Sequence, residues 1–382
     1  MTHLGRFTPP PRQVVLYGVP VAEALDQELN RLGAARIVFV TNSSLAQSGG
    51  LADTVTAALG TRAVSRVIGI GAHSPRRDVI RIADALREHR ADAVVGFGGG
   101  SVCDATKVAG LALANAVSTL DGITSLRAPA PHTKAPVVPF VAIPTTLSAG
   151  EFTCYAGVTD ERIQRKELFW HAAAAPDIVI LDAAMTVATP ARLWFGTGIR
   201  ALDHAVETWC SINVSPMVEA TSLHALRLLV PALRACQQDE SALAPRLEAL
   251  IGAWLSIQGV ATGVDLGASH GIGHMLGGTA GMPHGETSCV MLPHVLRYNS
   301  AVNAERQASL AAAMGSPEIA AADILQALVA SLGLPGRLRD ANVPRDLLPR
   351  IADESMRDMW IPTNPRPLTE SAQVLALLEA AW

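Results

Sequence analysis

The stretch VVGFGGGSVCDATKVAG, from Val94 to Gly110, decides the fold of this chain. An apolar run leads directly into three glycines and a serine, Gly98 to Ser101, and a segment with helical spacing follows. Glycine lets a ligand approach the backbone closely, and the unpaired N–H groups at the start of a helix attract phosphate. The spacing is not Gly-x-Gly-x-x-Gly, and no Gly-Lys-Ser/Thr follows as in a P-loop. The stretch therefore predicts a strand, a turn and a helix that hold the pyrophosphate of a dinucleotide.

Similar apolar runs recur along the first half of the chain, with helical patterns between them. From Ser74 to Arg90, for example, Val79, Ile82 and Leu86 fall on one helical face. Apolar strands that alternate with amphipathic helices indicate a parallel sheet covered by helices on both faces. The predicted strands are Arg36 to Thr41, Ser65 to Gly71, Ala91 to Gly98, Pro139 to Thr146 and Asp177 to Asp182.

Beyond about Pro190 the β-rich runs stop, and the sequence continues as successive helical patterns. We therefore expect residues 1–187 to form a Rossmann-like α/β domain that binds the dinucleotide. Residues 188–382 are expected to form an all-α domain that carries the chemistry. We expect a binding cleft between the two domains, because such clefts are the usual ligand sites.

Composition excludes several classes of protein. Of the 382 residues, 49% are hydrophobic and 17% are charged, which provides enough apolar surface for a folded core. The net charge of −4 and the lack of a basic run argue against a nucleic-acid partner. No stretch is apolar over the ~18 residues of a membrane span, and the N-terminus lacks the apolar core of a signal peptide. We expect a cytoplasmic protein in which the five scattered cysteines are reduced.

A second loop with ligand-binding character, Pro144 to Ser148, follows another predicted strand. It offers three hydroxyl groups at the edge of the sheet where open α/β folds bind their ligands. Asn42 follows the first predicted strand, and its amide can bond a ribose hydroxyl without repelling a 2'-phosphate. The cofactor is therefore expected to be NADH or NADPH. The predicted cofactor-binding residues are Asn42, Gly98, Gly99, Gly100, Ser101, Asp104, Thr145, Thr146, Leu147 and Ser148.

Four histidines gather in the helical half, each beside small residues: His204, His270, His274 and His284. His270 and His274 lie four residues apart and are expected on one helix face. Histidines grouped in this way predict metal ligands, proton-transfer groups, or both.

These motifs, in this order, resemble the iron-containing (group III) alcohol dehydrogenase family. The family carries G-G-G-S-x-x-D-x-x-K, a P-T-T loop, G-x-D-A-x-x-H-x-x-E, H-x3-H, P-H-G and L-P-H-V. Here these read GGGSVCDATK, PTTLS, GIRALDHAVE, HGIGH, PHG and LPHVLRYN, over nearly the whole chain. The resemblance implies a Rossmann-like domain followed by an all-helical domain, a nicotinamide cofactor, a homodimer, and a divalent metal held by one Asp and three His.

One position departs from the family pattern. Where the family has its metal-binding Asp, this chain has Arg200, and a guanidinium has no lone pair to give to a metal. We therefore expect no conventional metal site. A metal bound in spite of Arg200 would use His204, His270 and His284. Asp203, three residues further along, is expected to point away from Arg200 and not to replace the missing acid.

Arginine at this position resembles the maleylacetate reductases within the family, as do His73 and the fragment Asn364 to Pro367. This resemblance implies hydride transfer to an unsaturated keto-acid, from maleylacetate to 3-oxoadipate, in the degradation of aromatic compounds. Arg200, Arg366 and His73 would bind the carboxylate substrate. The expected catalytic residues are His274 as the proton donor, Arg200 as the charge that stabilises a developing oxyanion, and His204, His270 and His284 around them.

Three other functions remain compatible with the residues. The first is a metal-dependent (Fe or Zn) alcohol dehydrogenase or carbonyl reductase that acts on another small alcohol or ketone. The second is a lyase of the dehydroquinate synthase type, which shares this architecture, although the P-T-T and P-H-G loops favour the dehydrogenase. The third is a paralogue that binds the nucleotide and has lost catalysis.

Overall fold

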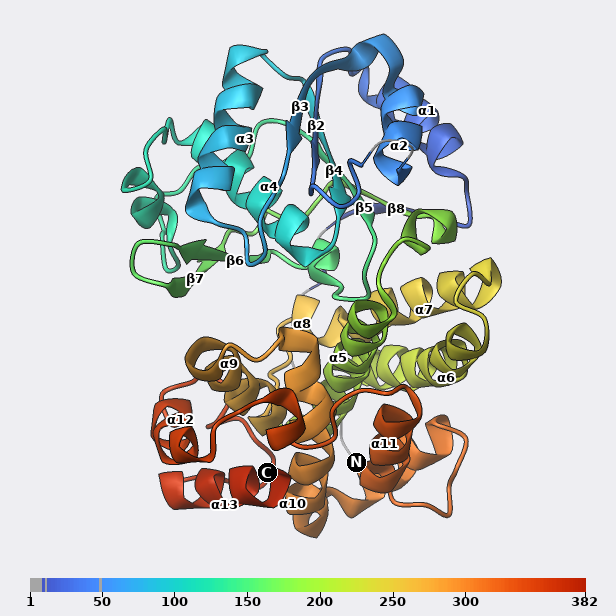
Figure 1. The fold of residues 1–382 in the computed structure, drawn as a ribbon, viewed down its shortest axis with the longest axis vertical. Coiled ribbons are helices and arrows are strands. Elements are labelled where there is room, and N and C mark those ends of the chain that lie inside the picture. The colour runs from blue at the N-terminus through green and yellow to red at the C-terminus, as the bar shows by residue number, and fades with distance from the viewer. Residues whose placement is uncertain (1–8, 11, 48–49) are drawn as a thin grey trace. The chain divides into compact units, whose positions relative to one another are not determined.

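The computed structural model describes residues 9–10, 12–47 and 50–382, and these form two compact units. One unit consists of the described residues of Pro11–Thr189, and the other contains Pro190–Trp382. The first combines strands and helices, whereas Pro190–Trp382, described throughout, contains helices and no strand (Figure 1). The predicted fold class, an α/β part followed by an all-α part, is confirmed.

A six-stranded parallel sheet forms the centre of the α/β unit. Its strands, in sheet order, are β1 (Val14–Tyr17), β8 (Ile178–Leu181), β5 (Phe140–Pro144), β4 (Ala93–Gly98), β2 (Ile37–Thr41) and β3 (Ala63–Ile68). The four inner strands are buried at every residue, because helices cover both faces. Gly98 pairs with Pro144 at the ends of β4 and β5, so the loops after both strands leave the same edge of the sheet.

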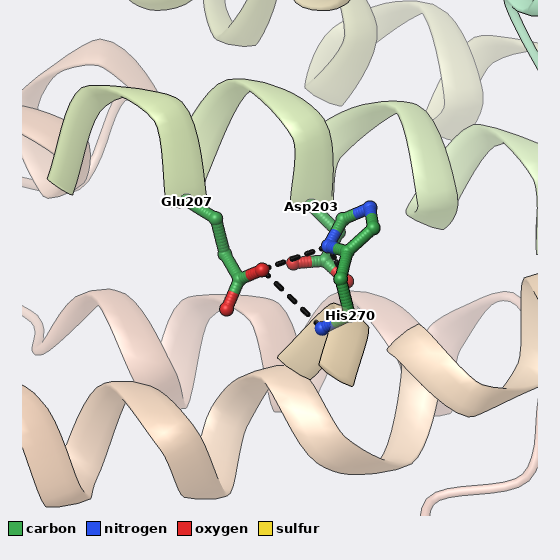
Figure 2. Close-up of side chains that lie close together, drawn as sticks. All are labelled: Asp203, Glu207 and His270. Carbon is green, nitrogen blue, oxygen red and sulfur yellow. Dashed lines mark hydrogen bonds and ion pairs between the residues drawn. The ribbon is translucent and has the colours of Figure 1, made fainter. Parts of the chain in front are cut away.

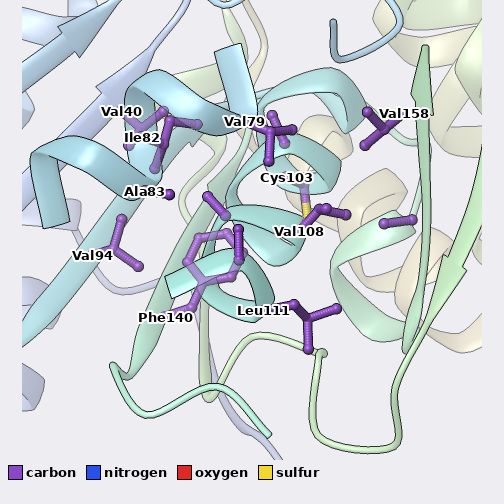
Figure 3. Packing of buried hydrophobic residues seen from close by; sticks show 14 of the residues in the cluster. Val40, Val79, Ile82, Ala83, Val94, Cys103, Val108, Leu111, Phe140 and Val158 are labelled. Atoms are coloured by element: carbon purple, nitrogen blue, oxygen red, sulfur yellow. The ribbon is translucent and has the colours of Figure 1, made fainter. Parts of the chain in front are cut away.

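Four helices cover the sheet: α1 (Val21–Leu32), α2 (Leu51–Leu59), α3 (Arg76–Glu88) and α4 (Gly100–Ala114). Val40 of β2 belongs to the core beneath α3 and α4, where it joins Val79 and Ile82 (Figure 3). Its neighbour Phe39 belongs to the core beneath α1 and α2, because successive residues of a strand point to opposite faces. In Figure 1 these two helix pairs accordingly flank the strands.

The five predicted strands are confirmed, with their ends within three residues of the predicted ones. Three further strands are not predicted by the sequence patterns. β1 is a four-residue edge strand whose Tyr17 is 56% exposed, so it lacks a long apolar run. β6 (Tyr155–Asp160) and β7 (Arg165–Trp170) form a separate antiparallel hairpin. Buried residues alternate with partly buried ones along β6 and with exposed ones along β7, as is typical of half-buried strands.

Buried charges hold this hairpin to α3. Arg76 is 1% exposed, pairs with Glu167 of β7 and lies 3.2 Å from the carboxylate of Asp160 on β6. Its guanidinium also donates to the carbonyl of Leu120 (2.8 Å).

The α/β unit further contains short 3-10 helices at Gly60–Arg62, Gly122–Leu126, Gly150–Phe152 and Ala183–Thr186.

The described segment Pro190–Trp382 of the helical unit contains nine α-helices. They are α5 (Ala191–Cys210), α6 (Pro216–Gln238), α7 (Leu243–Ser256), α8 (Gln258–Ala261), α9 (Ala268–Ala280), α10 (His284–Ala313), α11 (Ala321–Ser331), α12 (Leu348–Ser355) and α13 (Ser371–Ala381), with 3-10 turns at Arg339–Ala341 and Arg345–Leu347. α9, α10, α12 and α13 share one core, which includes Ile272, Val295, Ile351 and Leu378. Among the described residues, no helix is both long and apolar enough to cross a membrane.

Candidate active site

The glycine turn joins β4 to α4 and packs against the loop after β5. A Cβ at Gly99 would lie 2.9 Å from Cγ2 of Thr146, and one at Gly98 would lie 2.6 Å from Cγ2 of Val102. Neither position therefore accepts a side chain without a shift of its neighbours. The main-chain N–H of Thr145 donates to the carbonyl of Gly98 (3.1 Å). The structure thus brings the two predicted cofactor loops together beside the start of α4, where a phosphate would find main-chain N–H groups.

The hydroxyl groups of the second loop are already ordered. Thr146 Oγ1 donates to Ser148 Oγ (3.2 Å), and a Cβ at Gly100 would lie 3.2 Å from the same hydroxyl. The carbonyl of Thr145 accepts from Thr189 Oγ1 (2.6 Å). The side chain of Leu147 is fully buried, so this residue can meet a ligand only through its main chain.

Asn42 follows β2 and closes its own turn. Its Oδ1 accepts from the hydroxyl of Ser44 (2.9 Å) and from the main-chain N–H of Leu45 (3.0 Å). The NH₂ group of the Asn42 side chain is left for a ligand, and this group can only donate hydrogen bonds.

Two charged residues of α4 hold the start of the hairpin. Asp104 Oδ2 accepts from the main-chain N–H of Gly157 (2.9 Å). Lys107, 2% exposed, donates to the carbonyls of Gly150 (2.6 Å) and Tyr155 (2.7 Å). Asp104 was predicted to bind the cofactor, and in the structure its carboxylate ties β6 to α4.

His73 lies against the glycine turn. It has a left-handed backbone with φ of 62°, which costs a non-glycine residue energy and is common at functional sites. Its N–H donates to Ser101 Oγ (3.0 Å), and its carbonyl accepts from Thr159 Oγ1 on the hairpin (2.9 Å). Partial burial, and then the charge of Lys166 on β7, lower the pKa of His73. Lys166 could not be singled out from the sequence, because its strand has no continuous apolar run to mark it.

Arg200, a residue of α5, lies in the middle of the histidine cluster. The side chain is buried, with one guanidinium nitrogen 2.8 Å from Nε2 of His284 and the other 3.1 Å from Oγ of Ser288. Because a guanidinium can only donate, Nε2 of His284 accepts and carries no proton. Burial is the main cause that lowers the pKa of Arg200, and the nearby carboxylates of Asp203, Glu207 and Asp358 oppose it.

Asp203 belongs to the same network, and the expectation that it points away from Arg200 is wrong. Its Oδ2 accepts from the hydroxyls of Ser288 (2.6 Å) and Ser269 (2.7 Å). Ser288 thus links the guanidinium of Arg200 to the carboxylate of Asp203. Residues three apart lie almost one helical turn apart and share a face, which explains the placement.

Glu207 anchors the start of α9, as Figure 2 shows. Its carboxylate accepts from the main-chain N–H groups of Gly267 (3.0 Å), Ser269 (2.8 Å) and His270 (3.3 Å). It also lies 2.8 Å from Nδ1 of His270. Burial raises the pKa of both Glu207 and Asp203, and the charge of Arg200 opposes this effect at Asp203.

His204 and His270 lie side by side, with ring centroids 5.0 Å apart. Burial, followed by the charge of Arg200, lowers the pKa of each well below its ordinary value, so both rings are neutral near pH 7. Nδ1 of His204 and Nε2 of His270 are buried without a hydrogen-bond partner among the described residues. A polar atom that is buried without a hydrogen bond costs free energy, and this holds for both atoms.

His274 lies at the open side of the cluster. Its side chain is 35% exposed, and its ring stacks on that of His284 at 5.7 Å with an interplanar angle of 2°. Nδ1 lies 2.8 Å from Oδ2 of Asp358, a residue that the sequence analysis did not single out. All four predicted histidines and Arg200 therefore fall in one cluster.

Arg366, which was predicted to bind the substrate as a second cation beside Arg200, lies outside this cluster. Its guanidinium stacks on the ring of Tyr298 at 4.2 Å and donates to the carbonyl of the same residue (3.2 Å). His284 and Tyr298 are fourteen residues apart on α10, about 20 Å at the rise of a helix. The stack on Tyr298 therefore holds Arg366 far from the guanidinium of Arg200.

These residues do not fit a divalent metal of the kind that the resemblance implies. Among the described residues, one group of three has its ligand atoms within 4.8 Å of one another, and it is Asp203, Glu207 and His270. His204, His270 and His284 do not form such a group. Arg200 occupies the lone pair of His284, and main-chain N–H groups occupy the oxygens of Glu207. A buried guanidinium would also repel the ion.

Known proteins match the chain over almost its full length. The model of the iron-containing alcohol dehydrogenases matches residues 11–183, and that of the C-terminal part of the same family matches residues 195–382. The chain belongs to the iron-containing alcohol dehydrogenase family. Members of this family are oxidoreductases, and the predicted family and class of enzyme are confirmed.

Relatives within the alcohol dehydrogenase family carry different names. Dehydrogenase ALT3 of Alternaria alternata is 32% identical over 91% of this chain and 99% of its own length. Maleylacetate reductase 1 of Cupriavidus pinatubonensis is 30% identical over 96% of this chain and 94% of its own. The crystal structure of a 1,3-propanediol oxidoreductase has a TM-score of 0.90 and 27% identity, and the match covers 99% of this chain and 100% of that one.

Proposed function

We propose that this member of the family is an NAD(P)H-dependent reductase of the maleylacetate reductase type, which reduces an unsaturated keto-acid. The observation that carries the proposal is the buried guanidinium of Arg200, hydrogen-bonded to Nε2 of His284. It places a fixed positive charge where the family motif has an acidic metal ligand. The similarity to maleylacetate reductase 1 supports the same substrate class.

The cofactor would be held by the glycine turn and the loop after β5. Gly98 and Gly99 lie in a closely packed turn that accepts no Cβ without a shift of its neighbours, and the N-terminus of α4 favours a phosphate. The amide of Asn42 is neutral and repels neither cofactor, so NADH and NADPH are both proposed. When bound, the reduced nicotinamide supplies a hydride.

Arg200 would stabilise the charge that this reaction creates. When hydride adds to the carbon–carbon double bond of a conjugated keto-acid, the electron pair moves to the ketone oxygen and an enolate forms. A buried cation stabilises an oxyanion far more strongly than an exposed one, because the surrounding dielectric is low. Its planar fork also suits a carboxylate of the substrate. His274, at the open side of the cluster, would then donate the proton that converts the enolate into the saturated keto-acid.

The histidines around Arg200 would complete the pocket. The unpartnered Nδ1 of His204 and Nε2 of His270 could each bond a polar group of the substrate. His73 would bind a carboxylate of the substrate, with the charge of Lys166 beside it. A metal-dependent alcohol dehydrogenase remains the second candidate, supported by the similarity to 1,3-propanediol oxidoreductase.

A substrate comparison tests the proposal. The purified protein would be given NADH or NADPH with maleylacetate, and in parallel with an uncharged enone and a simple ketone, while loss of absorbance of the reduced cofactor is followed. The proposal expects much faster oxidation with the keto-acid. Equal or faster turnover of the uncharged compounds would favour the second candidate.

A further inference from the structure

The carboxylate of Asp358, a residue outside the family motifs, is hydrogen-bonded to His274, the proposed proton donor. Oδ2 of Asp358 lies 2.8 Å from Nδ1 of His274, and the Asp358 side chain is 8% exposed against 35% for His274. We propose that Asp358 is a positioning residue that fixes the tautomer and orientation of the His274 ring. The inference rests on the proposed function only in that His274 acts there as the proton donor.

The chain segment that carries Asp358 is held firmly against α9. The main-chain N–H of Asp358 donates to the carbonyl of Ser355 at the end of α12 (2.9 Å), and Ile361 is 1% exposed. Gly271, three residues before His274, lets this segment approach closely. A Cβ at Gly271 would lie 3.1 Å from Ile361 and 3.2 Å from Oδ1 of Asp358.

The two oxygens of Asp358 have separate partners. Oδ1 accepts from the main-chain N–H of Trp360 (2.9 Å), which leaves Oδ2 for His274. An ionised carboxylate only accepts, so Nδ1 of His274 must carry the hydrogen of this bond. Nε2 is then the ring nitrogen that gains and loses the catalytic proton.

A second contact fixes the plane of the same ring. The ring of His274 stacks on that of His284, whose Nε2 accepts from Arg200. The stack sets the plane, and Asp358 sets the rotation of the ring within it and the position of its proton. Together they would hold Nε2 of His274 in a constant position relative to the cation.

The substitution Asp358→Asn tests this role with little change in shape. The bond from the N–H of Trp360 to Oδ1 selects one orientation of the new amide, which places its NH₂ toward His274. An NH₂ can only donate, so Nδ1 would have to give up its hydrogen and the proton would move to Nε2. The matched control is Asp353→Asn, an exposed acid on the neighbouring helix α12.

We expect Asp358→Asn to lower kcat by at least about tenfold, since a histidine in the incorrect tautomer is a much poorer acid–base catalyst. The KM for NADH should be unchanged, and Asp353→Asn should behave as wild type. The double variant Asp358→Asn/His274→Ala should be no slower than His274→Ala alone, because Asp358 acts through His274. A purely structural role would instead give additive losses and a lower Tm.

A readout without activity separates this inference from the proposed function. Nitrogen-15 NMR of histidine-labelled protein, with the His274 signal assigned through His274→Ala, reports which ring nitrogen carries the proton. We expect Nδ1 in the wild type and Nε2 in Asp358→Asn. The same nitrogen in both proteins, or a wild-type kcat in Asp358→Asn, would overturn the inference. If the wild type does not reduce maleylacetate but reduces another carbonyl compound, the proposed substrate is wrong. The kinetic comparison of the variants is then made with that other carbonyl compound.

Discussion

Arg200 donates to Nε2 of His284 over 2.8 Å, and this bond joins α5 to the first residue of α10. A histidine nitrogen that accepts from a guanidinium has no free lone pair for a metal ion. The positive charge that a metal would bring is already present, and Asp203 balances it through Ser288. We propose that the cluster works with a fixed organic cation in place of a metal.

Gly99→Val should weaken NADH binding by at least about tenfold, which corresponds to ~1.4 kcal/mol. The new side chain would collide with Thr146, since even its Cβ would lie 2.9 Å from Cγ2 of that residue. Isothermal titration calorimetry measures the change. Gly278→Val is the control, because a Cβ at Gly278 has no neighbour within 4 Å. Unchanged affinity in Gly99→Val would remove the cofactor from this turn.

Arg200→Ala should raise the KM for a carboxylate substrate much more than that for an uncharged one, because the cation and its fork are lost. Arg200→Lys keeps the charge without the planar fork and should also lose activity. Steady-state kinetics with both substrates checks the split. Equal effects on both substrates, with a lower Tm, would mean that Arg200 only packs the core.

Arg200→Asp should create a metal site. The substitution releases Nε2 of His284 and places a new carboxylate next to Asp203, a set of ligands suited to Zn²⁺ or Fe²⁺. Metal analysis after dialysis against zinc, beside the wild type, measures the gain, and turnover of the diacid should fall. A variant that takes up no metal and keeps wild-type turnover would contradict both the geometry and the role given to Arg200.

The stability of the α/β unit should depend on pH through Glu151. This side chain is 3% exposed, and burial raises its pKa to about 7. Because the folded value lies above the unfolded one, its favourable contribution is complete at low pH and is lost as the pH rises toward 7. Relative to wild type, Glu151→Gln should therefore gain stability between pH 5 and pH 8 in thermal unfolding. The exposed Glu23→Gln is the control, and a pH-independent difference for Glu151→Gln would contradict the prediction.

The fold could be predicted from the sequence because its signals are local. The run from Val94 to Gly110 contains a strand, a turn and a helix start within seventeen consecutive residues, and the structure reproduces all three. β7 could not be found in this way, because only alternate residues such as Phe169 are buried.

The candidate site was predictable only in part. Arg200 and the four histidines were found because their residue types are distinctive, and the structure brings them together. Asp358 and Ser288 lie far from their partners in sequence, so no spacing relates them. The position of Arg366 was not predictable, because nothing local shows that its guanidinium stacks on Tyr298.

The most direct test of the account is the activity of the metal-free protein. The wild type would be treated with EDTA, freed of chelator, checked by metal analysis, and assayed for NADH or NADPH oxidation with maleylacetate. The account predicts that full activity remains without metal and that added Zn²⁺ or Fe²⁺ does not increase it. Loss of activity on chelation, with recovery when zinc or iron is added, would contradict the claim that Arg200 takes the place of the metal.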